Sequence, residues 1–277
     1  MVSLSEPPMK LLDWIDISKL SWSALSENPN AIELLKANQE KINWTFLSLN
    51  HNAIELLKEN ENNIDWYYLS ANKEACSLLK NNLGKVNWNF LSRNPGVISI
   101  LNDNIDNISW SHLAANPNAI KLLKQHKKHN NWLYFSLNPN AIPILKKNPS
   151  YIDWEFLSAN PNAISLLKSN PRKINWFHLS GNKNAIELLK ENQDKINWYM
   201  LSGNPCAIDI LKENQEKISW FNFSTNPAIF TYDYEKMRNL NKDLKEEIIA
   251  GALNPSRLFK LKENYDEKEI YDAYFNY

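Results

Sequence analysis

Six basic side chains crowd one short stretch of the sequence and could together bind an anion. They are Lys121, Lys124, His126, Lys127, Lys128 and His129. We predict a contact with an anion or an acidic partner here, and the alternative is a loosened link whose charged side chains lie in water. His126 and His129 have a spacing that metal sites use, but no carboxylate or cysteine lies nearby in sequence to complete a ligand set, so we predict no metal.

Three aromatic residues at a spacing of 22 form a second candidate site: Phe177, Tyr199 and Phe221. Each directly follows a Trp, in a place where other copies of the same motif have residues as different as Ser23 and Leu133. In a tandem repeat, positions that vary between copies line the exposed faces where partners bind. We therefore predict an apolar strip that binds a partner.

No sequence motif for catalysis is present. The sequence has no nucleophile motif, glycine-rich phosphate loop or HExxH-type metal site, and only 5 of its 277 residues are Gly. The 31 basic and 31 acidic residues give a formal net charge of zero, which argues against a field that attracts nucleic acid or an anionic membrane. We predict a protein that is not an enzyme and has no cofactor.

The cysteines and the hydropathy pattern indicate in which cellular compartment the protein is located. Cys76 and Cys206 are far apart in sequence and occupy different places in the repeat, which predicts neither a disulfide nor a metal site. We see no secretory signal and no apolar run of about 20 residues that could cross a membrane. These features predict a cytoplasmic protein that is not secreted.

The candidate residues belong to a tandem repeat with a strict period. Ten Trp residues recur every 22 positions from Trp22 to Trp220, and one unit runs WEFLSANPNAISLLKSNPRKIN from Trp154. Asn, Asp or Ser precedes each Trp, as expected for the N-cap of a short helix. Six residues after each Trp comes Asn, usually followed by Pro, which marks the start of a second helix.

Three ladders of repeated residues have both a functional and a structural interpretation. The Trp residues could be stacking platforms, but we predict that each fills the gap between neighbouring repeats. The Asn residues six after Trp could recognise a ligand, but a recognition position should vary, so we predict caps. Lys residues such as Lys168 could follow a phosphate backbone, but nearby acids predict a solvated face of mixed charge. A further Asn such as Asn170 should close the second helix in the left-handed conformation.

Short helices of this kind are stable only when stacked on their neighbours. The sequence predicts an all-α fold, an α-solenoid of about ten 22-residue helical hairpins with N- and C-terminal helical caps. We place an N-terminal cap at 1–21, the ten-repeat solenoid at 22–230, and a C-terminal helical cap at 231–277.

The unit W-x-x-L-S-x-N-P-N-A-I-x-L-L-K-x-N and the stretch LNPSRLFKLKENYDEKEI near the end resemble the NPNAI-type repeat proteins of giant DNA viruses that infect amoebae and protists. The resemblance implies a viral protein that binds a host or virion partner, in the host cytoplasm or in the virion. The family offers no catalytic residues.

Two functions of different classes follow from these features. The first is a non-catalytic scaffold that binds a protein partner, from the host or the virion, through the variable repeat positions. The alternative is a nucleic-acid-binding solenoid that uses the lysine ladder and the basic cluster of residues 121–129.

Overall fold

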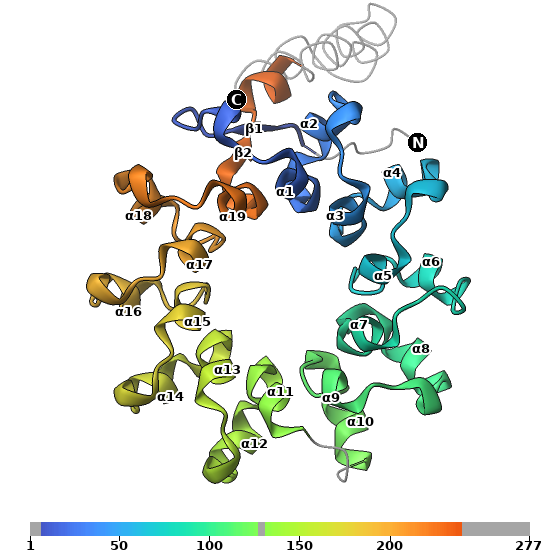
Figure 1. Ribbon diagram of the computed structural model, residues 1–277, viewed down its shortest axis with the longest axis vertical. Helices are drawn as coiled ribbons and strands as arrows, with labels where there is room; N and C mark the ends of the chain where they lie inside the picture. The colour runs from blue at the N-terminus through green and yellow to red at the C-terminus, as the bar shows by residue number, and fades with distance from the viewer. Residues whose placement is uncertain (1–6, 127–130, 240–277) are drawn as a thin grey trace, which may run out of the picture. The chain divides into compact units, whose positions relative to one another are not determined.

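The computed structural model describes residues 7–126 and 131–239 and confirms an all-α repeat fold (Figure 1). Each repeat begins with an inner helix at its Trp, and the first nine repeats continue into an outer helix. The inner helices are α1 (Trp22–Glu27), α3 (Trp44–Leu49), α5 (Trp66–Leu69), α7 (Trp88–Arg93), α9 (Trp110–Leu113), α11 (Trp132–Leu137), α13 (Trp154–Ala159), α15 (Trp176–Ser180), α17 (Trp198–Ser202) and α19 (Trp220–Thr225).

The outer helices follow the inner ones after a short 3-10 turn or a bend. They are α2 (Ile32–Lys36), α4 (Ile54–Glu59), α6 (Cys76–Lys80), α8 (Ile98–Asp103), α10 (Ile120–Gln125), α12 (Ile142–Lys147), α14 (Ile164–Lys168), α16 (Ile186–Lys190) and α18 (Ile208–Glu213). Two short strands, β1 (Met9–Leu11) and β2 (Phe230–Tyr232), pair with each other.

The local sequence sets both helix starts and the core. The side chain of Asp153 accepts a hydrogen bond from the backbone N–H of Phe156, as expected for an N-cap. Leu157 in the inner helix and Ala163 before the outer helix are fully buried. Burial of a Leu side chain contributes about 1.5–3 kcal/mol, so the repeated Leu positions supply much of the stability of each repeat.

The Asn that closes each outer helix acts differently from our prediction. Asn170 has a φ of −135°, and no non-glycine residue in the described ranges has a positive φ. Instead, its side-chain Nδ2 donates to the carbonyl of Leu166, four residues earlier, at 3.0 Å. The prediction of a left-handed closing residue was wrong because the Asn amide satisfies an orphan carbonyl of the helix end directly.

The Asn six after each Trp joins neighbouring repeats as well as capping. Oδ1 of Asn160 accepts from the backbone N–H of Asn162, while Nδ2 donates to the carbonyls of Ser136 and Asn138 in the preceding repeat, both at 2.9 Å. The same three bonds occur in all ten repeats. The asparagines are Asn28, Asn50, Asn72, Asn94, Asn116, Asn138, Asn160, Asn182, Asn204 and Asn226.

These bonds run around a closed circle, because the first repeat contacts the last. Nδ2 of Asn28 donates to the carbonyls of Ser224 and Asn226, both at 2.9 Å, as every other Asn of the series does to its preceding repeat. Within the unit Leu11–Thr231, the inner helices form an inside ring and the outer helices surround it (Figure 1). The solenoid therefore has no exposed first or last inner helix.

The tenth repeat is assembled from both ends of the sequence. It has helix α19 but no outer helix, and its closing link is supplied by η1 (Ile17–Lys19), Leu20 and Ser21. The backbone N–H of Ser21 donates to Oγ of Ser224 at 2.9 Å, the same bond that Asn43 makes to Ser26 in the first repeat. This split repeat closes the circle.

The chain divides into two compact units. One is Leu11–Thr231, and the other combines Met1–Lys10 with Tyr232–Tyr277, of which residues 7–10 and 232–239 are described. The expected N-terminal helical cap differs from the structure, because its described part contains β1 and the single turn η1. Of the expected C-terminal helical cap, residues 234–239 are helical and residues 240–277 lie outside the described residues.

Candidate functional site

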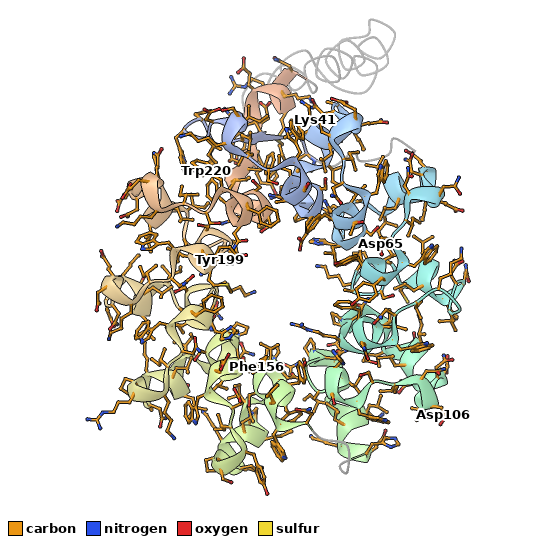
Figure 2. The ribbon with its side chains drawn as sticks, viewed as in Figure 1. Lys41, Asp65, Asp106, Phe156, Tyr199 and Trp220 are labelled. Atoms are coloured by element: carbon orange, nitrogen blue, oxygen red, sulfur yellow. The ribbon has the colours of Figure 1, made fainter. Side chains whose placement is uncertain are left out.

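The predicted apolar strip lies on the inner helices. Phe177, Tyr199 and Phe221 are the second residues of α15, α17 and α19 and are 45%, 52% and 46% exposed. Figure 2 labels Tyr199 on the inner side of the ring of helices, whereas Asp106 lies at its outer edge. Sequence reasoning missed a fourth exposed ring in the same place, Tyr67 at 49%, although its position after Trp66 is the signal that could have found it.

A second row of rings lies beside the strip, two residues after the Trp in seven of the ten repeats. Its members are half-buried and touch from repeat to repeat, with ring centroids 5.8 Å apart for Tyr134 and Phe156 and 6.0 Å for Phe156 and His178. We use "inner face" for the residues one, two and five positions after each repeat Trp. These ring contacts between repeats make much of the inner face aromatic.

Few charges occur on this face. The ten inner helices contain no lysine, and their charged residues other than histidine are Glu27, Arg93 and Glu155. Oε1 of Glu155 lies 3.2 Å from Nε2 of His178. Burial and, after it, the nearby Arg93 guanidinium lower the pKa of His112, so this ring is neutral near pH 7.

The Trp rings that begin the repeats are half-buried. In five repeats a Lys nineteen residues later lies over the ring, for example Lys173 over Trp154 at 4.5 Å from the centroid. Lys19 lies over Trp220 at 5.1 Å, which completes the pattern across the split repeat. The rings and these lysines thus stabilise each other by cation–π interaction.

The other lysine ladder lies on the outer helices. Lys36, Lys58 and Lys190 each form an ion pair with the Glu three residues earlier, at 3.3, 2.8 and 3.0 Å. The outer helices that carry this ladder surround the inner helices that carry the exposed aromatic rings (Figure 1).

The basic cluster is described only in part. Lys121 and Lys124 are exposed on α10, and the His126 ring packs against Trp110 with centroids 4.8 Å apart. Lys127, Lys128 and His129 lie outside the described residues. The structure thus brings together His126 and Trp110, but does not test the predicted anion contact.

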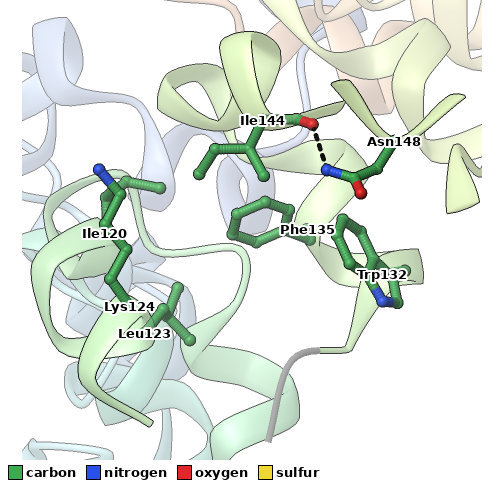
Figure 3. A pocket seen from close by; sticks show the side chains of 7 residues that line it. All are labelled: Ile120, Leu123, Lys124, Trp132, Phe135, Ile144 and Asn148. Atoms are coloured by element: carbon green, nitrogen blue, oxygen red, sulfur yellow. Dashed lines mark hydrogen bonds between the residues drawn. The ribbon is translucent and has the colours of Figure 1, made fainter. Parts of the chain in front are cut away.

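A hollow of about 690 Å³ lies beside this cluster, between α10, α11 and α12 (Figure 3). Its walls are mostly apolar and include Lys124, while Nδ2 of Asn148 donates to the carbonyl of Ile144 at its edge. The lining residues are Ile120, Leu123, Lys124, Trp132, Phe135, Ile144 and Asn148. The link that joins α10 to α11 contains Asn130, where nine other copies have Ile, Val or Leu.

Other classes of site are not found in the described part of the chain. No group of three or more His, Cys, Asp or Glu side chains there could hold a metal ion. No described helix is long and apolar enough to span a bilayer. Comparison with protein-family models, with curated proteins and with solved structures found no match.

Proposed function

We propose that this chain is a non-catalytic scaffold that binds a protein partner through the aromatic strip of Phe177, Tyr199 and Phe221. The observation that carries the proposal is the concentration of large exposed rings at one variable position of the inner helices. Aromatic residues are the commonest anchors of protein interfaces, because each buries much area and loses little conformational entropy. On the resemblance of its repeats, the partner is a host or virion protein and the scaffold is viral.

The distribution of charge favours a protein over a nucleic acid. A site for single strands combines stacking rings with cations along one groove. Here the exposed rings lie on inner helices without lysine, and the lysines lie on outer helices or over Trp rings. The nucleic-acid alternative rests on the lysine ladder and the 121–129 cluster, and it predicts a salt-dependent shift of single-stranded RNA or DNA.

The proposal is tested by quantitative capture from host or infected-cell lysate with the full chain. Phe177→Ala, Tyr199→Ala and Phe221→Ala combined should reduce recovery of a stoichiometric protein at least tenfold, because each anchor contributes about 2 kcal/mol or more. The control is Tyr151→Ala, which removes a ring that is 55% exposed but stacks on Trp132 away from the strip. Equal recovery by the triple variant contradicts the assigned face, and nuclease-sensitive recovery favours the alternative.

A further inference from the structure

Glu27 is a half-buried acid on the inner face without a described partner. It is the last residue of α1 and lies five positions after Trp22, where other repeats have residues such as Leu49 and Ala71. Burial raises the pKa of its carboxyl group, and among the described residues no charge or hydrogen bond opposes that effect. Within the described ranges no ion pair of Glu27 is found. A cation placed beside this carboxyl group would favour its charged form.

The repeat geometry places aromatic rings beside this carboxylate. A β-carbon at Gly181, five after Trp176, would lie 3.1 Å from Cε of Met200, two after Trp198. The fifth position of one repeat therefore contacts the second position of the next, and the effect of Arg93 on His112 follows the same rule. By this rule Glu27 lies beside Phe46.

Phe221 of the tenth repeat supplies a second aromatic ring where the first and last repeats meet. Ala24, at the second position of the first repeat, is fully buried and has no ring of its own. Phe221 of the tenth repeat and Phe46 of the second repeat meet there edge to face, with centroids 6.2 Å apart. Because Phe221 remains 46% exposed, a partner can reach this pair of rings.

We propose that Glu27, Phe46 and Phe221 together receive a lysine or arginine side chain of the protein partner. Aromatic rings attract a cation through their negative faces, and a carboxylate adds a charge-assisted hydrogen bond. The inner helices contain no lysine, so none of them supplies a competing ammonium group. A phosphate backbone is repelled by the same carboxylate, and a hydrocarbon chain cannot compensate it.

This inference rests on the proposed protein-binding function and names the chemistry of its partner. The probe is a set of random peptides displayed on phage and selected against the full chain, followed by affinity measurement on synthetic copies. The selected peptides should share a lysine or arginine. Glu27→Gln keeps the shape of the side chain but should weaken their binding about 10- to 100-fold, the effect of one charge-assisted hydrogen bond.

The control is Glu155→Gln, another acid of the inner helices but one that faces His178. It should leave peptide affinity within about threefold of the wild type. Replacement of the peptide's lysine by norleucine should weaken binding to the wild type and have little further effect on Glu27→Gln, since the two changes remove the same interaction.

Three outcomes separate this inference from the proposed function. Selected peptides without a basic residue, or basic peptides that bind Glu27→Gln as tightly as the wild type, overturn the inference alone. Selected peptides that bind the double variant Phe177→Ala/Tyr199→Ala as tightly as the wild type show that the aromatic strip is not the binding site, whatever the effect of Glu27→Gln. Failure to select any peptide overturns both.

Discussion

Single residues divide into those that build the ring and those that remain available to a partner. The Asn six after Trp is buried and engaged in the frame, since Oδ1 and both Nδ2 hydrogens form hydrogen bonds in every repeat, as for Asn160. A residue used in this way cannot also recognise a ligand. By contrast, the ring of Tyr199 is half exposed and the carboxylate of Glu27 has no described counterion.

Glu27 should make the stability of the free protein depend on pH. Its folded-state pKa is raised, so the folded chain holds the proton more tightly than the unfolded chain, whose ordinary value is 4.5. Below pH 4.5 Glu27 is protonated, and the tighter proton binding of the folded chain contributes fully to its stability. This contribution is lost as the pH rises through the folded-state pKa. Glu27→Gln should therefore have a higher urea midpoint than the wild type at pH 7.

The measurement is urea unfolding of both proteins between pH 4 and pH 8. The two midpoints should converge as the pH falls, because both side chains are then neutral. Glu155→Gln provides the comparison for an exposed acid. A wild type that is more stable than Glu27→Gln at pH 7 would show that Glu27 already has a favourable partner within the chain.

Nine of the ten inner helices are joined to the link that follows their repeat by a serine hydroxyl. Oγ of Ser158 donates to the carbonyl of Trp154 at 2.7 Å and accepts from the backbone N–H of Asn175 at 3.0 Å. The fifth repeat has Ala114 in this place, fully buried like the serines. This repeat also contains the altered link of residues 126–131, so two departures from the pattern coincide.

Ala114→Ser should restore the missing connection. The new hydroxyl can donate to the carbonyl of Trp110 and accept from the backbone N–H of Asn131, with an expected gain of about 0.5–1.5 kcal/mol. The matched change Ser158→Ala should cost about 1–3 kcal/mol, because it leaves the N–H of Asn175 unpaired. Urea unfolding measures both effects. A loss of stability in Ala114→Ser would mean that the backbone of the fifth repeat differs from the others.

The sequence predicts the helices well because their start signals are local. Asn or Asp before Trp, and Asn-Pro six residues on, need only neighbouring residues to act as caps. It predicts the exposed position of Phe177, Tyr199 and Phe221 from variation between copies. It does not predict the contact of Phe46 with Phe221, since these residues are 175 positions apart and meet only when the chain has closed on itself.

At the scale of the molecule, closure takes the place of terminal caps for the repeats. An open solenoid exposes apolar surface at each end and needs polar capping units. Here the repeat array starts with the end of a repeat, Lys19-Leu20-Ser21, and its tenth repeat has no outer helix after Pro227–Ile229. The two fragments are complementary, and this complementarity is the signal of closure that the sequence contains. Trp14 contributes too, with its ring centroid 5.7 Å from that of Phe223.

Closure should make the junction of the first and last repeats as strong as an interior one. Asn28→Ala removes the donor to Ser224 and Asn226, and Asn160→Ala removes the equivalent donor to Ser136 and Asn138. Each change leaves one buried carbonyl without a side-chain donor, that of Ser224 or Ser136, and removes the acceptor of one backbone N–H, that of Asn30 or Asn162. The carbonyls of Asn226 and Asn138 keep a backbone donor, so each change should cost about 2–4 kcal/mol in urea unfolding. The control is Asn162→Ala, whose Nδ2 bond to Pro139 is exposed and should contribute less than about 1 kcal/mol.

Hydrogen exchange gives an independent measure of the same property. In an open solenoid the terminal helices fray, so their amides exchange faster than those of the middle repeats. In the closed unit α1 and α19 each have a neighbour on both sides, and their amides should be protected to the same degree as those of α13. Asn28→Ala should raise exchange in α1 and α19 together, and Asn160→Ala should raise it in α11 and α13. Faster exchange of α1 and α19 in the wild type would instead indicate a ring that opens at its split repeat.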